Sequence, residues 1–390
     1  MNFFWRIVFL SLCVSSLWGK SLSVEVSARS AILMNADTGA VLFEKQAHIP
    51  AYPASTTKIG TALFILDEKK AQLHRNAVVS ETSLRMKTAA LGSDIAYALE
   101  PDGTMMGLKK GEVLSLETLL HGVIMISGND AANVIAESLS GSVPQFMNEM
   151  NSYLSRLGCQ RTFYRNPHGL HHPEHVTTAY DLALMMKHGL SIPKFRELVG
   201  KTSYLRPKSN KSSQEEIVTF NQSIKPGRYY DPRSIGGKTG YHSQSMATFV
   251  SAAHDQGRNL IAVLLGCSKT SRYEDAKRLF DAAFSEERVS RLLVGAERMF
   301  SQNIEGAERP LIASLQKPLQ ISYFPSEEPT CRAFIHWHKP ALPIKQGQIV
   351  GEVQIIDEKG SIVIRAPLVA KEPLQGTWAF RVKQWFSCAM

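Results

Sequence analysis

The sequence contains little of what marks a disordered, fibrous or nucleic-acid-binding chain. It has only 18 Pro and 26 Gly in 390 residues, with no internal repeat and no low-complexity tract, which excludes collagen-like and intrinsically disordered classes. It also has no run of five or more basic residues, although its formal net charge is +9. That charge favours an acidic partner such as nucleic acid, anionic lipid or an anionic polymer, but basic residues spread this thinly make nucleic acid the less favoured of these.

Two further absences concern metal-binding cysteines and membrane spans. No CxxC pair is present to suggest a zinc site. Beyond the N-terminal region, no stretch is long and apolar enough to cross a membrane. What the chain does have is 44% hydrophobic and 20% charged residues. At this length, that composition predicts two or three domains with sizeable cores.

Residues 1–23 have the pattern of a secretory signal peptide. One cation, Arg6, precedes an apolar run from Ile7 to Leu17, and small residues follow. The run is about half of the roughly 20 residues that a spanning helix needs, so a retained transmembrane anchor is the less favoured alternative. We therefore expect an exported, periplasmic protein of the cell envelope.

The last residues, 371–390, predict an amphipathic helix. Trp378, Val382, Trp385 and Phe386 share one face at 3.6 residues per turn, and basic residues such as Arg381 lie on the other. Aromatic side chains opposite cations suit a helix lying in a membrane interface, which predicts peripheral attachment to the inner membrane. The alternative is a terminal helix that covers a protein core.

Four cysteines remain outside the predicted signal peptide, namely Cys159, Cys267, Cys331 and Cys388. An exported protein can form disulfides. The spacing selects no pairing, and four unpaired thiols are equally compatible with a chain of this size.

The hydrophobic pattern predicts an α+β fold for residues 24–290. A hairpin over 29–45 comes first, and helices are predicted over 55–67, 114–125, 130–139, 143–157 and 178–188. Strands over 247–253 and 259–266 precede a helix over 273–284. Strands at both ends suggest an antiparallel sheet with an inserted helical layer. Residues 84–107 are expected to form a long, functional loop.

Residues 291–370 predict a small all-β, sandwich-like domain. Short alternating runs occur over 319–323, 333–337, 348–356 and 362–365, and the last two flank a hairpin turn at 357–360.

Ser55 and Lys58 form the first motif that carries chemistry. They follow Pro53 at a predicted helix start, and a spacing of three residues places the hydroxyl and the amine on one face. A serine becomes nucleophilic when a base takes its proton, and a lysine with a lowered pKa can be that base. Two other Ser-x-x-Lys copies, at 191–194 and 314–317, lie at prolines and outside any continuing helix.

Two more motifs follow in the order expected of one enzyme class. Ser127, Gly128 and Asn129 lie in a turn between two predicted helices. Lys238, Thr239 and Gly240 follow two glycines and lead toward a strand. Each has a plain reading as turn or cap residues, but the ordered trio is the signature of penicillin-binding proteins and class A β-lactamases.

With these motifs, the chain resembles the low-molecular-weight penicillin-binding proteins, specifically the D-alanyl-D-alanine carboxypeptidases of serine peptidase family S11. The likeness runs from Ala31 to the end. It implies the serine β-lactamase/penicillin-binding-protein-like transpeptidase fold, followed by the small β domain and the amphipathic anchor. It also implies removal of the terminal D-alanine from peptidoglycan stem pentapeptides through an acyl-enzyme, β-lactams as covalent inhibitors, and no cofactor.

The resemblance also implies roles for individual residues. Ser55 would be the acylated nucleophile, Lys58 its base and Ser127 a proton relay. The residues implied to bind substrate are Asn129 at an amide, Lys238 as a positive charge, Thr239 and Gly240 of the same motif, and Arg272 at the terminal carboxylate. Backbone N–H groups of Ser55 and Tyr241 would stabilise the oxyanion. Members of this group often have His after the Lys-Thr-Gly motif, whereas this chain has Tyr241 and then His242.

Four rival functions compete with this one. The run His171 to His175 fits the H-x-x-E-H pattern of a zinc peptidase, but Pro173 interrupts the helix that this chemistry needs. A class A β-lactamase needs a deacylating glutamate, which is not evident here. A catalytically silent envelope-binding protein is disfavoured because every expected catalytic side chain is present. D,D-endopeptidase or transpeptidase activity would use the same acyl-enzyme and is left open.

Overall fold

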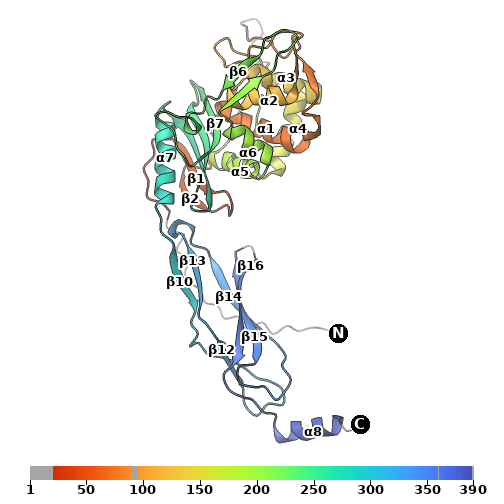
Figure 1. Cartoon of the computed structure of the whole chain (residues 1–390), viewed down its shortest axis with the longest axis vertical. Coiled ribbons are helices and arrows are strands. Elements are labelled where there is room, and N and C mark those ends of the chain that lie inside the picture. Colours follow the sequence, from red (N-terminus) through yellow and green to blue (C-terminus); the bar gives the residue numbers. More distant parts are fainter. Residues whose placement is uncertain (1–20, 89–94, 359, 389–390) are drawn as a thin grey trace. The chain divides into compact units, whose positions relative to one another are not determined.

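The computed structural model describes residues 21–88, 95–358 and 360–388 (Figure 1). These residues fall into two compact units, one spanning Ser21–Ser285 and the other beginning at Glu286. Most of the predicted signal peptide, residues 1–20, lies outside the described residues.

A five-stranded antiparallel sheet forms the middle of the first unit. Its strands, in spatial order, are β2 (Val41–Lys45), β1 (Ser30–Asn35), β9 (Arg258–Cys267), β8 (Met246–Asp255) and β7 (Ser234–His242). The sheet therefore joins both ends of the unit, as the sequence predicts. The strand β7 lies at one edge, so one side of its backbone has no neighbouring strand in this sheet.

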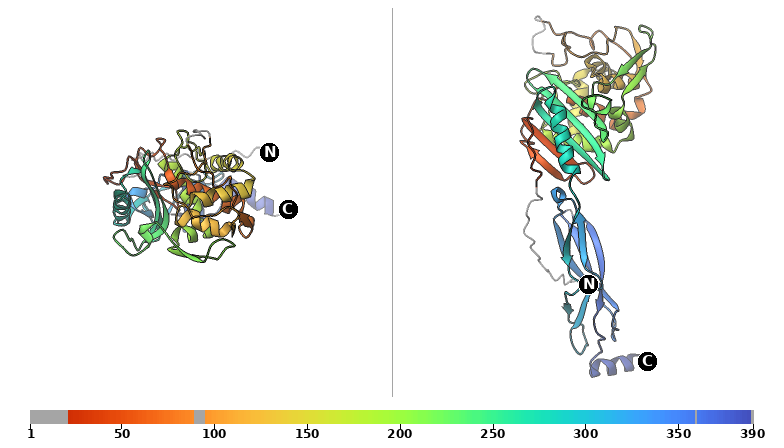
Figure 2. Two further views of the ribbon diagram at one scale, coloured as in Figure 1. Left: turned by 90° about the horizontal axis from the view of Figure 1, so that it is seen from above. Right: turned by 60° about the vertical axis from the view of Figure 1, so that its left-hand side comes forward.

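Both faces of this sheet are covered because its strands are apolar on both sides. In β1, Ile32 and Met34 belong to the core beneath the helices, whereas Ala31 and Leu33 belong to a second core on the opposite face. Helix α7 (Ser271–Phe284) covers that second face, as the right-hand view of Figure 2 shows. This arrangement places the helical layer on a single side of the sheet.

The helical layer contains five predicted helices and one that was missed. The predicted ones are α1 (Thr57–Glu68), α2 (Leu116–Met125), α3 (Asn129–Ser140), α4 (Val143–Arg156) and α5 (Ala179–Leu190). Ser115, Ser142 and Thr178 cap α2, α4 and α5 by accepting a backbone N–H. The missed helix α6 (Pro193–Gly200) begins at a proline, which is a favoured first helical residue.

The shortest elements escaped prediction because three or four residues carry too little periodicity. They form two small antiparallel pairs, β3 (Asn76–Val78) with β4 (Val113–Ser115) and β5 (Ser203–Arg206) with β6 (Glu215–Val218). The turns η1 (Ala54–Thr56), η2 (Lys70–Gln72) and η4 (Gln222–Ile224) are short 3₁₀ helices. Residues 89–94 of the predicted 84–107 loop lie outside the described residues, and the described remainder contains no named helix or strand.

The second unit is built from strands, as expected. One sheet has the order β11 (Phe300–Gln302), β12 (Leu311–Leu315), β16 (Ile362–Ala370), β15 (Ile349–Asp357) and β14 (Cys331–Trp337). A second pairs β10 (Val289–Val294) with β13 (Leu319–Tyr323), and η5 (Pro325–Glu327) follows β13. The predicted hairpin β15–β16 is confirmed, whereas β10, β11 and β12 were missed.

The chain ends in α8 (Trp378–Cys388). Phe380 packs against the core of the second unit, while Trp378 and Trp385 are 75% and 71% exposed. Across the described residues, every helix is too short or too polar to cross a bilayer. The thiols of Cys159, Cys267 and Cys331 are free, and the first two are buried.

Candidate active site

The backbone just before Ser55 forms a strained turn that several hydrogen bonds hold in place. Ala54 has a φ of +50°, a left-handed conformation that costs a non-glycine residue of the order of 1 kcal/mol or more. The Pro53 carbonyl accepts hydrogen bonds from the hydroxyls of Thr56 and Thr248, at 2.7 and 2.8 Å. The Thr57 hydroxyl donates to the Ala54 carbonyl at 2.8 Å. These bonds fix the backbone that presents Ser55 at the start of α1.

Lys58 is fully buried one turn later in α1. Its Nζ lies 2.7 Å from Oδ1 of Asn129, 2.6 Å from the carbonyl of His168 and 3.1 Å from the Ser55 hydroxyl oxygen. A neutral amine has two N–H donors and one lone pair. The two nearer oxygens are pure acceptors, which leaves the lone pair for the hydroxyl proton of Ser55.

The surroundings favour that neutral form of Lys58. Burial lowers its pKa well below the ordinary value, and the positive charge of Lys238 lowers it further, while the charge of Asp130 acts in the opposite direction. Desolvation disfavours an ammonium, and a nearby cation does so too. Lys58 is therefore placed and tuned to accept a proton.

The Ser127–Asn129 turn brings the second motif to the same place. Ser127 has a φ of +63°, and its hydroxyl oxygen is buried without a hydrogen-bond partner among the described residues. Such a group is unusual in a folded protein and marks a position where a ligand or water can complete the bonding. Asn129 begins α3, and its N–H donates to the Thr104 carbonyl at 2.9 Å.

The third motif lies within the edge strand β7, so the plain reading of Lys238–Gly240 as a turn was wrong. A Cβ on Gly240 would lie 2.8 Å from the Ser55 nitrogen, so only glycine lets the strand approach the backbone of Ser55 this closely. Burial, followed by the charge of Arg272, lowers the pKa of Lys238 to about 7. Lys238 is buried and donates to the Thr239 carbonyl at 2.8 Å.

Arg272 and Tyr241 lie at the far end of this motif. The Arg272 guanidinium, from α7, donates to the Gly240 carbonyl at 3.1 Å. Tyr241 is 54% exposed, and the Lys269 ammonium lies 4.2 Å from the centre of its ring. Contacts or electrostatic interactions link six candidate residues to one another, namely Ser55, Lys58, Asn129, Lys238, Gly240 and Arg272. The other three candidates, Ser127, Thr239 and Tyr241, lie beside members of this group along the chain.

The histidines between residues 168 and 175 are divided between the core and the surface. His168 and His175 are fully buried, and burial with the charge of Lys58 lowers the pKa of His168 to about 3. His175 donates from Nε2 to the Thr57 hydroxyl at 2.8 Å and accepts the Arg165 N–H at Nδ1. Both ring nitrogens of His175 are therefore occupied, which removes it as a zinc ligand.

Only part of this cluster lies toward the surface. The His171 ring contacts those of Tyr52 and His242, with centroids 4.7 and 5.4 Å apart. His171 also lines a cavity of about 550 Å³ together with Lys87 and Glu100 of the 84–107 loop. No group of three or more potential ligands is placed to hold a metal ion in the described parts of the chain.

Sequence reasoning missed three contributors to the site. The His168 carbonyl is a backbone group, so the residue type gives no indication that this oxygen contacts Lys58. Gly169 has a φ of +94°, and a Cβ there would lie 1.9 Å from the Ala54 carbonyl oxygen. Asp130 directly follows the second motif, and its position next to Asn129 is the feature of the sequence that could have identified it.

Comparisons with known proteins place the chain among relatives of one description. The profile of the family described as D-alanyl-D-alanine carboxypeptidase, peptidase S11, matches residues 19–269. The chain is 28% identical over 353 residues to D-alanyl-D-alanine carboxypeptidase DacF of Bacillus subtilis, covering 89% of this chain and 86% of that protein. It is 32% identical over 264 residues to DacB2 of Mycobacterium tuberculosis, covering 66% and 82%.

A solved structure supports the same fold. Penicillin-binding protein 5 from Haemophilus influenzae superposes with a TM-score of 0.61 at 23% identity, covering 90% of this chain and 98% of that one. At this identity the likeness concerns the fold, and the predicted α+β architecture is confirmed.

Proposed function

Because this chain belongs to the family of D-alanyl-D-alanine carboxypeptidases, we propose that it removes the terminal D-alanine of peptidoglycan stem pentapeptides through an acyl-enzyme on Ser55. The chain is a serine-type carboxypeptidase of this family. The observation that carries the proposed chemistry is the three-way contact of Lys58 with the Asn129 amide oxygen, the His168 carbonyl and the Ser55 hydroxyl. A neutral Lys58 would donate to the first two, which leaves its lone pair for the Ser55 proton.

The proposed reaction begins when neutral Lys58 takes the Ser55 proton. The freed oxygen attacks the carbonyl of the penultimate D-alanine, and the backbone N–H groups of Ser55 and Tyr241 stabilise the oxyanion. Ser127 carries a proton to the departing amine, which leaves as D-alanine. Water then attacks the ester on Ser55, with Lys58 again as the base, and releases the shortened peptide.

Substrate recognition follows from the charges along β7. The terminal carboxylate of the peptide meets Lys238, the Thr239 hydroxyl and Arg272, since cations and hydroxyl groups are its natural partners. Asn129 offers its side-chain amide to the peptide bond next to the scissile one. β-Lactams acylate the same serine and persist there, because no deacylating glutamate is evident for them.

For the location, we propose export to the cell envelope after removal of residues 1–23. The proposed domains are a catalytic domain over 24–290, a β domain over 291–370 and an anchor over 371–390 that contacts the membrane peripherally. The exposed Trp378 and Trp385 of α8 support this contact, since tryptophan side chains favour the membrane interface.

The test of the proposed nucleophile uses intact-mass analysis after treatment with penicillin. The unchanged protein should carry one stable adduct that maps to Ser55, and Ser55→Ala should carry none. Ser191→Ala is the matched control, because Ser191 follows the end of α5 while the lysine of its Ser-x-x-Lys copy, Lys194, lies in α6. An adduct on Ser55→Ala would refute the assignment. Release of D-alanine from a pentapeptide ending in D-Ala-D-Ala tests the activity itself.

A further inference from the structure

A short stretch, the 104–108 segment, lies directly against the Ser127–Asn129 turn. The Thr104 carbonyl accepts the Asn129 N–H at 2.9 Å. The buried carboxylate of Asp130 accepts the N–H of Met106 at 2.7 Å and that of Leu108 at 3.0 Å. Three hydrogen bonds therefore join the segment to the end of the turn, one at Asn129 and two at the following residue, Asp130.

Met106 fits this turn closely. A Cβ on Gly122 would lie 2.5 Å from the Met106 sulfur, and one on Gly128 would lie 3.3 Å from the Met106 Cβ. A displacement of the segment cannot be absorbed by empty space, because protein interiors are close-packed. It would move the turn, and with it Asn129, whose Oδ1 lies 2.7 Å from the Lys58 Nζ.

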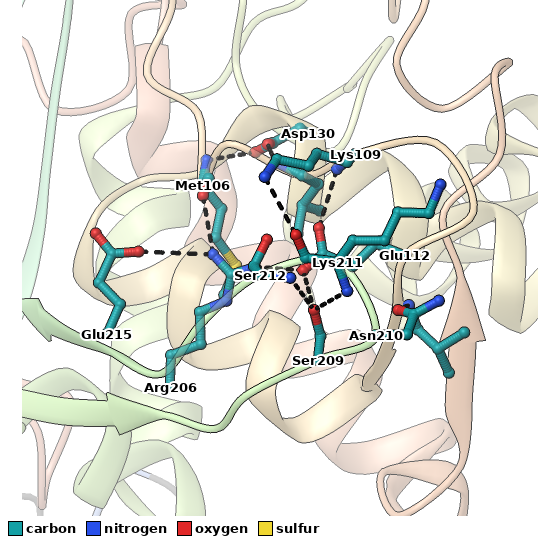
Figure 3. A network of polar contacts seen from close by, with 12 residues as sticks. Met106, Lys109, Glu112, Asp130, Arg206, Ser209, Asn210, Lys211, Ser212 and Glu215 are labelled. Carbon is teal, nitrogen blue, oxygen red and sulfur yellow. Dashed lines mark hydrogen bonds and ion pairs between the residues drawn. The ribbon is translucent and has the colours of Figure 1, made fainter.

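Arg206 of β5 holds the segment from the other side (Figure 3). Its Nη1 donates to the Met106 carbonyl at 3.3 Å, and its Nη2 donates to Oε1 of Glu112 at 2.6 Å. Arg206 and Glu112 are both buried, with side-chain exposures of 2% and 0%. Met106 is thus bonded through its N–H to Asp130 and through its carbonyl to Arg206.

Glu112 is itself well supported. Its Oε1 accepts the Ser209 hydroxyl at 2.6 Å, and its Oε2 accepts the Lys109 N–H at 3.0 Å. Burial raises the pKa of Glu112, but these hydrogen bonds and the Arg206 charge outweigh it, so the pKa is lowered overall. Glu112 therefore stays ionised beside Arg206.

The tip of the β5–β6 hairpin binds the same loop. Asn210 accepts the Val113 N–H at 2.8 Å and donates to the Gly111 carbonyl at 2.9 Å. A two-stranded hairpin is marginal alone, and these contacts attach it to the body of the unit. A buried ion pair adds little stability compared with apolar side chains of similar size. The hydrogen bond from Arg206 to the Met106 carbonyl indicates that this pair serves to order the 104–108 segment.

We propose that Arg206 is a positioning residue for acylation. Through its hydrogen bond to Met106, Arg206 holds the 104–108 segment against the Ser127–Asn129 turn, and this keeps Asn129 in contact with Lys58. This inference rests on the proposed function of Ser55 and Lys58. Arg206 does not touch the substrate. It acts through the Met106 peptide group and fixes the orientation of the base.

The test compares the full chain with Arg206→Met, with the pair Arg206→Met/Glu112→Leu, and with Arg206→Lys. Arg206→Met should lower kcat for the D-Ala-D-Ala peptide by roughly 10- to 100-fold with little change in KM, since small misplacements of catalytic groups act on this scale. It should also unfold at a lower temperature, because Glu112 is left buried without its cation.

The two other variants separate positioning from stability. Arg206→Met/Glu112→Leu removes both members of the pair, so neither is left as an unpaired buried ion, and the melting temperature should rise above that of Arg206→Met even though the Ser209 hydroxyl and the Lys109 N–H lose their acceptor. The kcat should stay low, since the Met106 carbonyl still lacks its donor. Arg206→Lys keeps the ion pair but cannot also form the second hydrogen bond, so it should fold normally and stay slow. Lys110→Met is the control, because Lys110 lies in the same loop in an exposed pair with Glu81.

The possible outcomes distinguish the positioning role of Arg206 from the proposed function of Ser55 and Lys58. A kcat equal to that of the unchanged protein in Arg206→Lys, or in the thermally recovered double variant, overturns the positioning role. If the unchanged protein itself is not acylated by penicillin and releases no D-alanine, the proposed function fails instead. Low kcat with a recovered melting temperature supports the inference.

Discussion

The active site contains two buried lysines in two different regions, the helix start at Lys58 and the edge strand at Lys238. Both have lowered pKa values, and burial is the leading cause in each. Their partners differ: Lys58 faces two carbonyl-type oxygens and a hydroxyl, whereas Lys238 donates to one carbonyl and lies near Arg272. Burial makes each amine easier to deprotonate, and the difference in partners distinguishes the proposed base, Lys58, from Lys238.

The largest effect should come from Lys58→Arg. A guanidinium stays protonated and cannot accept the Ser55 proton, so acylation should fall by about 10²- to 10⁴-fold, the usual contribution of a general base. The rate of penicilloyl adduct formation, followed by mass, measures it. Lys194→Arg, in the separate Ser-x-x-Lys copy, should leave the rate unchanged. Rapid acylation of Lys58→Arg would mean that another group is the base.

Lys238→Met should weaken substrate binding and also change the pH profile. Lost contact with the carboxylate should raise KM by roughly tenfold or more, since hydrogen bonds to charged groups contribute about 1.5–3 kcal/mol. The charged or titratable groups near Lys58 are Lys238, Asp130 and His168. Removing the Lys238 cation raises the pKa of Lys58, so the acidic limb of acylation should move to higher pH. A shift to lower pH would contradict this electrostatic coupling.

A smaller effect should appear when a carboxylate ligand binds. With its pKa near 7, Lys238 is partly neutral just above that pH. A bound carboxylate favours the ammonium and raises this pKa, so binding should take up a fraction of a proton between about pH 7 and 8. Calorimetry in buffers of different ionisation enthalpy measures the uptake. Lys238→Met should abolish it, and uptake that persists would place the proton elsewhere.

The smallest change in the chemistry of either lysine, and so in activity, is expected for a chain that ends at Leu374. Both lysines lie in the first unit, whereas this change removes α8 from the second. The Leu374–Ile344 backbone pairing is kept. Activity on a soluble peptide should be unchanged, while the protein leaves the membrane fraction. Continued sedimentation with membranes would place the anchor elsewhere.

The sequence predicted the Lys58 region better than the Lys238 region, for physical reasons. The helix at Ser55 follows from Pro53 and a long apolar period, and confirmed α1 begins within two residues of its predicted start. Lys238 is preceded by Gly236 and Gly237, which resemble a turn in sequence. In the structure they are strand residues, and a Cβ on Gly237 would lie 2.0 Å from the Val250 carbonyl oxygen.

Other parts of the site could not be predicted because they depend on backbone groups or distant contacts. The His168 carbonyl next to Lys58 has no side-chain signature. Ala54 and Ser127 have left-handed backbone conformations, which alanine and serine rarely adopt, so the residue types do not predict them. Arg206 reaches Met106 across 100 residues of sequence, and a periodicity within either segment contains no information about that contact.

The pairing of β1 with β9 has a consequence for how the first unit folds. Ser30 lies opposite Leu265, so the first strand of the unit cannot complete its pairing until the last strand, β9, has been made. Non-local pairings of this kind fold slowly, because a long loop must close before the contacts form. The sheet that supports both lysines can therefore close only after nearly the whole unit has been synthesised.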